Sequence, residues 1–168
     1  MTKIIGILNL TLDSFSDGGM YYDLESAKKH ISEMVDQGAD IIDIGAESTR
    51  SGFSDVSADS QINTLAPIVE FINKNHDIKI SIDTRSSKVI NSFFNQNISF
   101  VNDVSSGFHD KDMLKSVSHL KCNYIMTHMP DEHQKGINKK YSNVLDELDV
   151  FFKERIKSCI DEVLIMKR

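Results

Sequence analysis

The chain has 168 residues, enough for one domain with a sizeable core but fewer than the ~250 residues of a typical eight-stranded α/β barrel. Its net charge is −6, with lysine and arginine dispersed among carboxylates, which argues against nucleic acid as a partner. No apolar run approaches the ~18 residues of a membrane span, and the N-terminus has no secretory signal pattern, so we expect a cytoplasmic protein without a membrane partner.

Strand and helix patterns alternate along the chain. Short apolar runs predict strands at residues 4–8, 41–44, 78–82, 99–101 and 124–126. Apolar residues at helical spacing predict helices at residues 24–35, 62–72, 89–94, 113–117 and 144–163. Gly38 is expected to end the first helix, and Pro67 to kink the second or to mark its beginning. Five successive βα units predict one α/β domain with a parallel sheet and right-handed crossovers.

Four of the predicted strands end in polar residues. Strands joined by crossover helices all end on the same rim, and that rim binds ligands in α/β barrels and open α/β sheets. We therefore expect a ligand site there. The polar strand ends are Asn9, with the loop to Gly19; Asp43 with Glu47–Arg50; Asp83 with Thr84; and Asn102 with Asp103.

In order and spacing, these motifs resemble those of dihydropteroate synthase, together with the pair His128-Met129 after the fifth strand. The resemblance implies an α/β fold of the TIM type, a (β/α)8 barrel, of which this chain would form an incomplete barrel of about five βα units. Residues 1–168 would then be a pterin-binding domain truncated at its C-terminus. The implied activity is that of a folate-pathway transferase, which condenses 4-aminobenzoate with 6-hydroxymethyl-7,8-dihydropterin diphosphate to give dihydropteroate and diphosphate.

By this resemblance, Asp83 and Asn102 bind the pterin ring, and Asp83 and Arg50 are the candidate catalytic residues. A carboxylate accepts hydrogen bonds from ring N–H and amino groups, and an amide both donates and accepts. The alternative for Asp83 is a structural one, in which it caps the third helix through the Ser86 and Ser87 amides.

The resemblance also assigns Asn9, Thr49 and Arg50 to the diphosphate, and makes Asn9 the protein ligand of Mg²⁺. Mg²⁺ takes few protein ligands and keeps water or phosphate oxygens around it. The alternative for Asn9 is a local turn at the strand end, and a lone arginine in a polar loop is usually solvated. Arg85 follows the third strand, and we expect it to form only a structural salt bridge.

The resemblance also assigns two long loops, residues 11–19 and 46–57, to the aminobenzoate side of the site. Phe15 and Ser51 would be the residues nearest that substrate. Three positions depart from the pattern of the family. Leu12 and Ser51 replace usual prolines, and Thr127 stands where methionine is common, so their effect on substrate affinity stays open.

Two other functions remain open at this stage. One is a non-catalytic fragment with at most partial binding of pterin diphosphate, because three βα units of the barrel and their site residues have no counterpart here. The other is a pterin-dependent methyltransferase, which shares the strand-end Asp and Asn but has no use for Asn9, Thr49 and Arg50 as diphosphate ligands. Small-molecule substrates are the expected partners, and a homodimer is left open.

Overall fold

The computed structural model describes residues 2–10, 24–47, 55–129 and 140–166. Its five strands form one parallel sheet in chain order. They are β1 (Ile5–Asn9), β2 (Ile41–Gly45), β3 (Lys79–Asp83), β4 (Ile98–Asp103) and β5 (Asn123–Met126). The predicted strands and their parallel pairing are confirmed.

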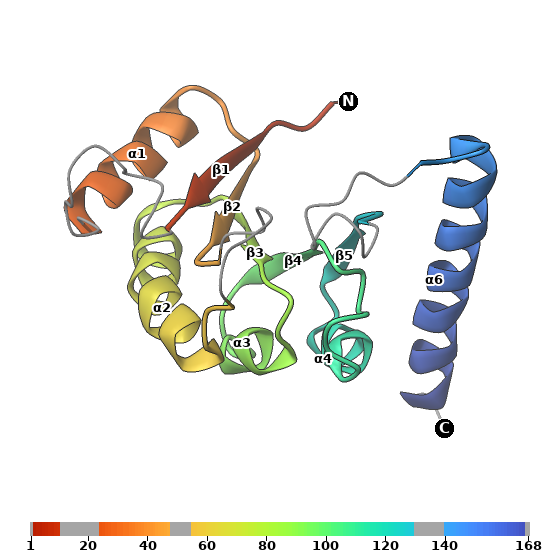
Figure 1. Ribbon diagram of the computed structural model, residues 1–168. Helices are drawn as coiled ribbons and strands as arrows, with labels where there is room; N and C mark the ends of the chain where they lie inside the picture. The colour runs from red at the N-terminus through yellow and green to blue at the C-terminus, as the bar shows by residue number, and fades with distance from the viewer. Residues whose placement is uncertain (1, 11–23, 48–54, 130–139, 167–168) are drawn as a thin grey trace.

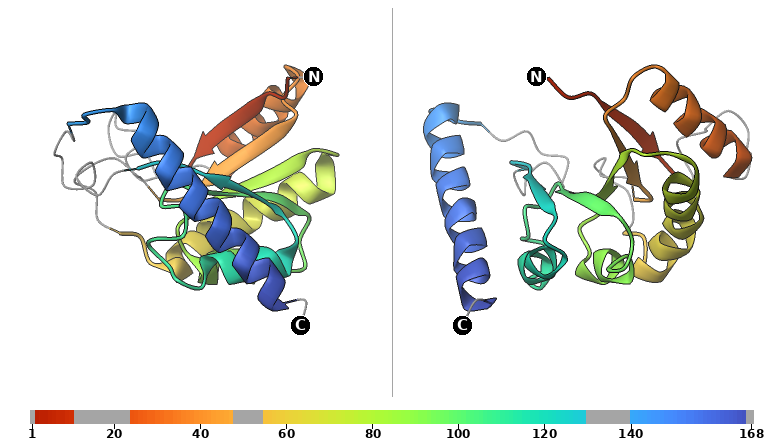
Figure 2. Two further views of the ribbon diagram at one scale, coloured as in Figure 1. Left: turned by 90° about the vertical axis from the view of Figure 1, so that its right-hand side faces the viewer. Right: turned by 180° about the vertical axis from the view of Figure 1, so that it is seen from behind.

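The helices cover one face of this sheet. They are α1 (Leu24–Asp36), α2 (Ala58–Asn75), α3 (Ser87–Ser92), α4 (Met113–Leu120) and α6 (Val144–Met166). Figure 1 shows α1 to α4 along the outside of the curved sheet, and Figure 2 shows α6 beyond β5 and α4. Strands in chain order, each followed by a helix on the outer face, are the architecture of an incomplete (β/α)8 barrel, as expected from the sequence.

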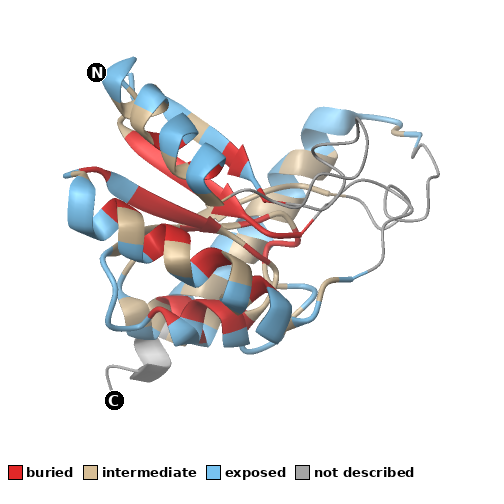
Figure 3. Cartoon of the chain, turned by 90° about the vertical axis from the view of Figure 1, so that its left-hand side faces the viewer, coloured by how far each residue is buried: buried red, intermediate tan, exposed pale blue. Residues whose placement is uncertain are grey.

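The hydrophobic core lies between the sheet and these helices, where Figure 3 shows the buried segments. Alternate residues of a strand point to opposite faces, so one set of strand side chains meets the helices. Burying an isoleucine or leucine side chain fully stabilises the fold by about 2–3 kcal/mol. The largest fully buried side chains include Ile42, Ile44, Ile80 and Ile82 of the sheet, with Ile31, Leu65, Ile68, Ile72 and Met113 of the helices.

Two local predictions concern helix ends. Gly38 adopts a φ of +95°, and the Gly38 and Ala39 amides donate to the carbonyls of Val35 and Met34 at the end of α1. The predicted glycine stop is therefore confirmed. Pro67 lies inside α2 rather than at its beginning.

Two predicted apolar faces are only partly buried. Phe94 is 58% exposed because α3 already ends at Ser92. In α6, Val144, Ile156 and Ile160 are each about half exposed, although the sequence assigned them to a buried stripe. The physical reason is that α6 packs mainly against α4, so one narrow side of the helix is covered. No helix among the described residues is long and apolar enough to cross a membrane.

Candidate functional site

The register of the sheet brings three of the predicted residues into one row. Asn9 of β1 pairs with Gly45 of β2, Gly45 pairs with Asp83 of β3, and Asp83 pairs with Asn102 of β4. These residues end or nearly end their strands, so the row lies along the rim at which the strand arrows end in Figure 1. It faces away from the helices because the alternate residue Ile44 points into the core.

Gly45 provides the space that the Asp83 carboxylate occupies. A Cβ atom at position 45 would lie 3.2 Å from Asp83 Cβ and 3.3 Å from Asp83 Oδ2. Contacts of that length are tighter than nine in ten real Cβ contacts, so the neighbouring atoms must shift by a few tenths of an ångström. Any side chain here would therefore push on Asp83.

The Asn102 side chain is hydrogen-bonded to Asp43. Asp43 belongs to the second polar strand end, and no role was predicted for it. Asn102 Nδ2 donates to Asp43 Oδ2 at 3.0 Å, and Asp43 is only 5% exposed. A carboxylate inside the apolar strand Ile41-Ile42-Asp43-Ile44 was the available sequence signal, because a buried charge needs a partner.

Asp83 lies in a crowded acidic environment. Burial raises the pKa of Asp83 to about 7, and the nearby carboxylates of Asp43, Asp103 and Glu47 add to this increase, while Arg85 opposes it. An ionised carboxylate without partners is costly in such surroundings. A ligand that presents N–H groups would stabilise the ionised form.

The alternative role for Asp83 was to cap the third helix through the backbone amides of Ser86 and Ser87. Both amides have other partners. Ser86 N donates to Thr84 Oγ1 at 3.2 Å, and Ser87 N donates to Asp110 Oδ2 at 2.7 Å. Within the described part of the chain, no group donates a hydrogen bond to Asp83. Its carboxylate is therefore left for something outside the polypeptide described here.

Arg85 forms the expected salt bridge, and its main partner is buried. Its Nη2 lies 2.8 Å from Glu47 Oε1 and 2.8 Å from Asp55 Oδ1, and its Nε donates to Glu47 Oε2 at 3.0 Å. Glu47 Oε1 also accepts from Val56 N. These bonds raise the pKa of Arg85 further above its ordinary value and lower the pKa of Asp55. Arg85 thus joins the end of β2, the start of the α2 segment and the end of β3.

Asp103 has a structural role and does not belong to the row. Its carboxylate accepts four hydrogen bonds, two from Ser105 (N and Oγ) and one each from Gly107 N and Tyr124 Oη, all between 2.7 and 2.8 Å. It is fully buried. These bonds tie the turn that follows β4 to Tyr124 of β5.

His128, the first residue of the His-Met pair, packs against α6. Its ring lies 4.7 Å from the Phe151 ring in an edge-on arrangement, and its Nε2 lies 3.8 Å from Glu147 Oε1. This packing gives His128 a structural role in the described part of the chain.

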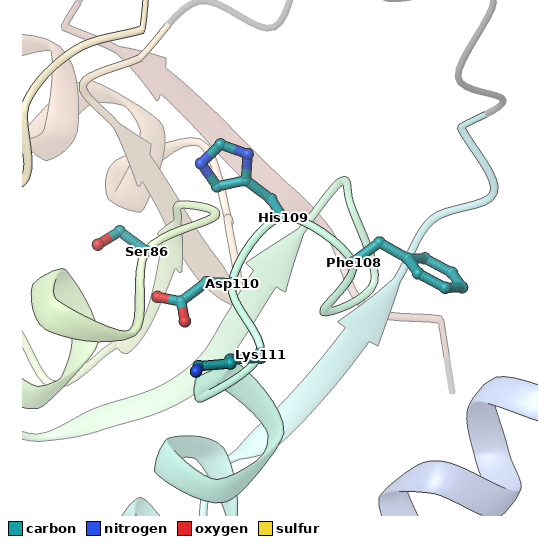
Figure 4. Close-up of a pocket in the computed structure, with 5 residues that line it drawn as sticks. All are labelled: Ser86, Phe108, His109, Asp110 and Lys111. Carbon is teal, nitrogen blue, oxygen red and sulfur yellow. The ribbon is translucent and has the colours of Figure 1, made fainter.

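An open hollow of about 440 Å³ lies beside the row, on the loops that follow β3 and β4. Figure 4 shows its five lining residues, with Phe108 turned away from Ser86 and Asp110. The Asp110 carboxylate is already bonded to the Ser87 and Asp112 amides. None of the five lining residues belongs to the row, so the hollow is separate from it.

Four predicted site residues, Phe15, Thr49, Arg50 and Ser51, lie outside the described residues. Asn9, which was predicted to contact the diphosphate and Mg²⁺, is exposed at the rim. Within residues 2–10, 24–47, 55–129 and 140–166, no group of three His, Cys, Asp or Glu side chains is arranged to hold a metal ion.

Comparisons with known proteins agree on one family. The family model described as "Pterin binding enzyme" matches residues 5–165. A dihydropteroate synthase of Clostridium beijerinckii is 39% identical over 160 residues, which cover 95% of this chain and 56% of that protein. The chain therefore spans about half the length of the curated relatives it matches.

Solved structures give the same result. A Yersinia pestis dihydropteroate synthase in a sulfonamide drug complex superposes with a TM-score of 0.86 at 31% identity, covering 95% of this chain and 58% of that one. A Xanthomonas albilineans dihydropteroate synthase with 4-aminobenzoic acid has a TM-score of 0.84 at 30% identity, with 95% and 56% covered.

Proposed function

Since the chain belongs to the pterin binding enzyme family, we propose that it carries out, or forms part of a protein that carries out, the dihydropteroate synthase reaction of folate biosynthesis. The substrates would be 4-aminobenzoate and 6-hydroxymethyl-7,8-dihydropterin diphosphate. The names of the relatives support this activity, and the Xanthomonas structure is one with 4-aminobenzoic acid. The cytoplasmic location and the homodimer stay predictions.

The observation that carries the proposal is the single row formed by Asn9, Gly45, Asp83 and Asn102. A pterin ring presents N–H donors and a carbonyl acceptor along one edge. A carboxylate without a described partner and the oxygen of a neighbouring amide match the N–H donors of that edge. Asn9, at the end of the row opposite Asn102, would contact the diphosphate rather than the ring.

In the proposed reaction, the bond between the pterin methylene carbon and the diphosphate oxygen breaks, and the electron pair leaves with the diphosphate. The amine of 4-aminobenzoate forms the new C–N bond and loses a proton. Asp83 and Asn102 hold the ring in place, and Thr49 and Arg50 bind the leaving group. A strong base is not needed, because the amine is already a nucleophile.

The Asn9 side-chain amide would hold Mg²⁺ together with the diphosphate. The described residues offer the exposed Asn9 amide oxygen at the row, and no three of their His, Cys, Asp or Glu side chains are arranged to hold a cation. That set suits an ion that keeps mostly water and phosphate oxygens as ligands. When bound, Mg²⁺ would neutralise charge on the leaving diphosphate.

The assignment of Arg50 gives a direct test of the proposal. Arg50→Ala is expected to weaken binding of the pterin diphosphate by about tenfold or more while leaving the affinity for free 6-hydroxymethyl-7,8-dihydropterin unchanged, because only the charge-assisted bonds to phosphate are lost. Calorimetric titration with both compounds measures the difference. Equal affinities of the unmodified chain for the two compounds would refute the role of Arg50.

Gly45 provides a second test, through the position of Asp83. Gly45→Ala places a methyl group 3.2–3.3 Å from Asp83 side-chain atoms and should displace that carboxylate. We expect pterin affinity to fall by about tenfold, with a loss of stability of about 1 kcal/mol from the tighter packing. Titration and a thermal melt measure the two effects. Unchanged pterin affinity would show that Gly45 does not protect the position of Asp83.

A further inference from the structure

A second layer of polar groups lies directly beneath the row. Asp43 and Ser81 are register partners on β2 and β3, two residues before Gly45 and Asp83. Asp43 is 5% exposed and Ser81 is fully buried. Within the described part of the chain, Asp43 Oδ1 and Ser81 Oγ have no hydrogen-bond partner.

These two unpartnered oxygen atoms belong to the concave face of the sheet. The residues between them and the row, Ile44 and Ile82, are fully buried among the core residues on the helix side. Residues two apart in a strand share a face, so Asp43 and Ser81 lie on the same face as Gly45 and Asp83. A buried polar group without a partner carries its full desolvation penalty, and two of them at adjacent positions indicate that a partner is missing.

The hydrogen bond between Asn102 and Asp43 also fixes which way the Asn102 amide is turned. The Asp43 carboxylate is an acceptor, so the amide nitrogen of Asn102 must face it, at 3.0 Å. The amide oxygen then points elsewhere, and none of the described residues donates a hydrogen bond to it. Asp43 therefore converts Asn102 from an amide with two orientations into an oriented acceptor.

We infer that Asp43 is the positioning residue of Asn102, and that Asp43 Oδ1 and Ser81 Oγ form the floor of the ligand site, where they receive the innermost N–H group of the bound heterocycle. This inference rests on the proposed function for the nature of the ligand. The described part of the site would then consist of hydrogen-bond acceptors, namely Asp43, Asp83 and the Asn102 oxygen. Such a site selects a ring edge that is rich in N–H donors.

The test uses Asp43→Asn and Ser81→Ala, with Asp77→Asn as a matched control. Asp77 is an exposed carboxylate before the start of β3, at the opposite end of that strand from Asp83. Each variant is titrated with 6-hydroxymethyl-7,8-dihydropterin, which lacks diphosphate, and separately with inorganic diphosphate. Thermal melts confirm folding.

Asp43→Asn is expected to lower pterin affinity by about tenfold or more, because a charged acceptor is replaced by an amide that also carries donors. Ser81→Ala should lower it severalfold, and Asp77→Asn should not change it. Affinity for diphosphate should stay the same in all three. Unchanged pterin affinity in Asp43→Asn, in a folded variant, would overturn the inference.

A measurement without ligand separates this inference from the proposed function. In the unliganded chain, the Asn102 side-chain amide protons should give an NMR resonance that moves upfield in Asp43→Asn, because the acceptor loses its charge, and that does not move in Asp77→Asn. An unmoved resonance in Asp43→Asn overturns the positioning role. If the unmodified chain binds no pterin while the resonance moves, the proposed function fails for this chain and the positioning role stands.

Discussion

Replacing Asp83 with alanine is expected to abolish detectable binding of the pterin ring. The carboxylate is half-buried at the centre of the row, and no described group donates to it, so it is the strongest acceptor left for a ligand. Loss of a charge-assisted hydrogen bond costs about 1.5–3 kcal/mol, and a ring that bonds through two N–H groups loses more. Asp83→Asn keeps the shape and should still lose at least tenfold in affinity.

The same residue predicts how binding depends on pH. Burial and neighbouring carboxylates raise the pKa of Asp83 to about 7, and the ionised form accepts from the ligand. Pterin affinity should therefore fall by about tenfold for each pH unit below about 6.5, and this decline should disappear in Asp83→Asn. Titration between pH 5.5 and 8.5 measures it. A flat profile in the unmodified chain would exclude Asp83 as the titrating acceptor.

The raised pKa also has a consequence for stability, with a definite sign. In the unfolded chain Asp83 ionises near its ordinary value of 3.8, but in the unliganded fold it ionises only near 7. Its contribution to stability is therefore fully present below pH 3.8 and is lost as the pH rises to about 7. A difference of about 3 in pKa corresponds to about 4 kcal/mol at most. Asp83→Asn should raise the melting temperature at pH 8 and not at pH 4, even as it weakens binding.

Replacing Arg85 with alanine should strongly destabilise the fold. The Arg85 side chain is 12% exposed and that of Glu47 only 6%, and removing the arginine leaves the Glu47 charge buried without its partner. Breaking a buried ion pair from one side costs about 3–5 kcal/mol. We expect a loss of stability of about 3 kcal/mol, at the lower end of that range, because Val56 N still donates to Glu47.

Denaturant unfolding of a double-mutant cycle measures this effect. Arg85→Ala combined with Glu47→Gln should be more stable than Arg85→Ala alone, since the unpaired charge is gone. Lys88→Ala is the control, because Lys88 pairs with Asp59 at 2.7 Å but both side chains are more than half exposed. It should cost less than about 1 kcal/mol. Equal effects of Arg85→Ala and Lys88→Ala would show that the Glu47 pair contributes little.

The sequence was sufficient for the element order and for the shared location of Asn9, Asp83 and Asn102. Strand periodicity identified the βα units, and the common rim of parallel strands brought the polar strand ends together. Their exact alignment in one row was not predictable, because it depends on strand register, which single strand patterns do not determine.

Contacts between distant residues were beyond the sequence alone. Arg85 and Glu47 are 38 positions apart, and nothing in the local pattern pairs them. The role of Asp43 was missed for a related reason: its carboxylate was visible in an apolar strand, but its partner Asn102 lies 59 positions away. Ile156 and Ile160 were predicted to be buried but are about half exposed. Helical periodicity identifies an apolar face of a helix but does not show what covers that face.

The most direct test of the proposed function is calorimetric titration of this chain with 6-hydroxymethyl-7,8-dihydropterin diphosphate, with and without Mg²⁺, alongside a thermal melt. We predict a cooperative melt and binding that tightens when Mg²⁺ is present and that is lost in Asp83→Ala. A folded chain that binds the compound equally well with Asp83 replaced, or does not bind it at all, would contradict the assignment of this row as a pterin site.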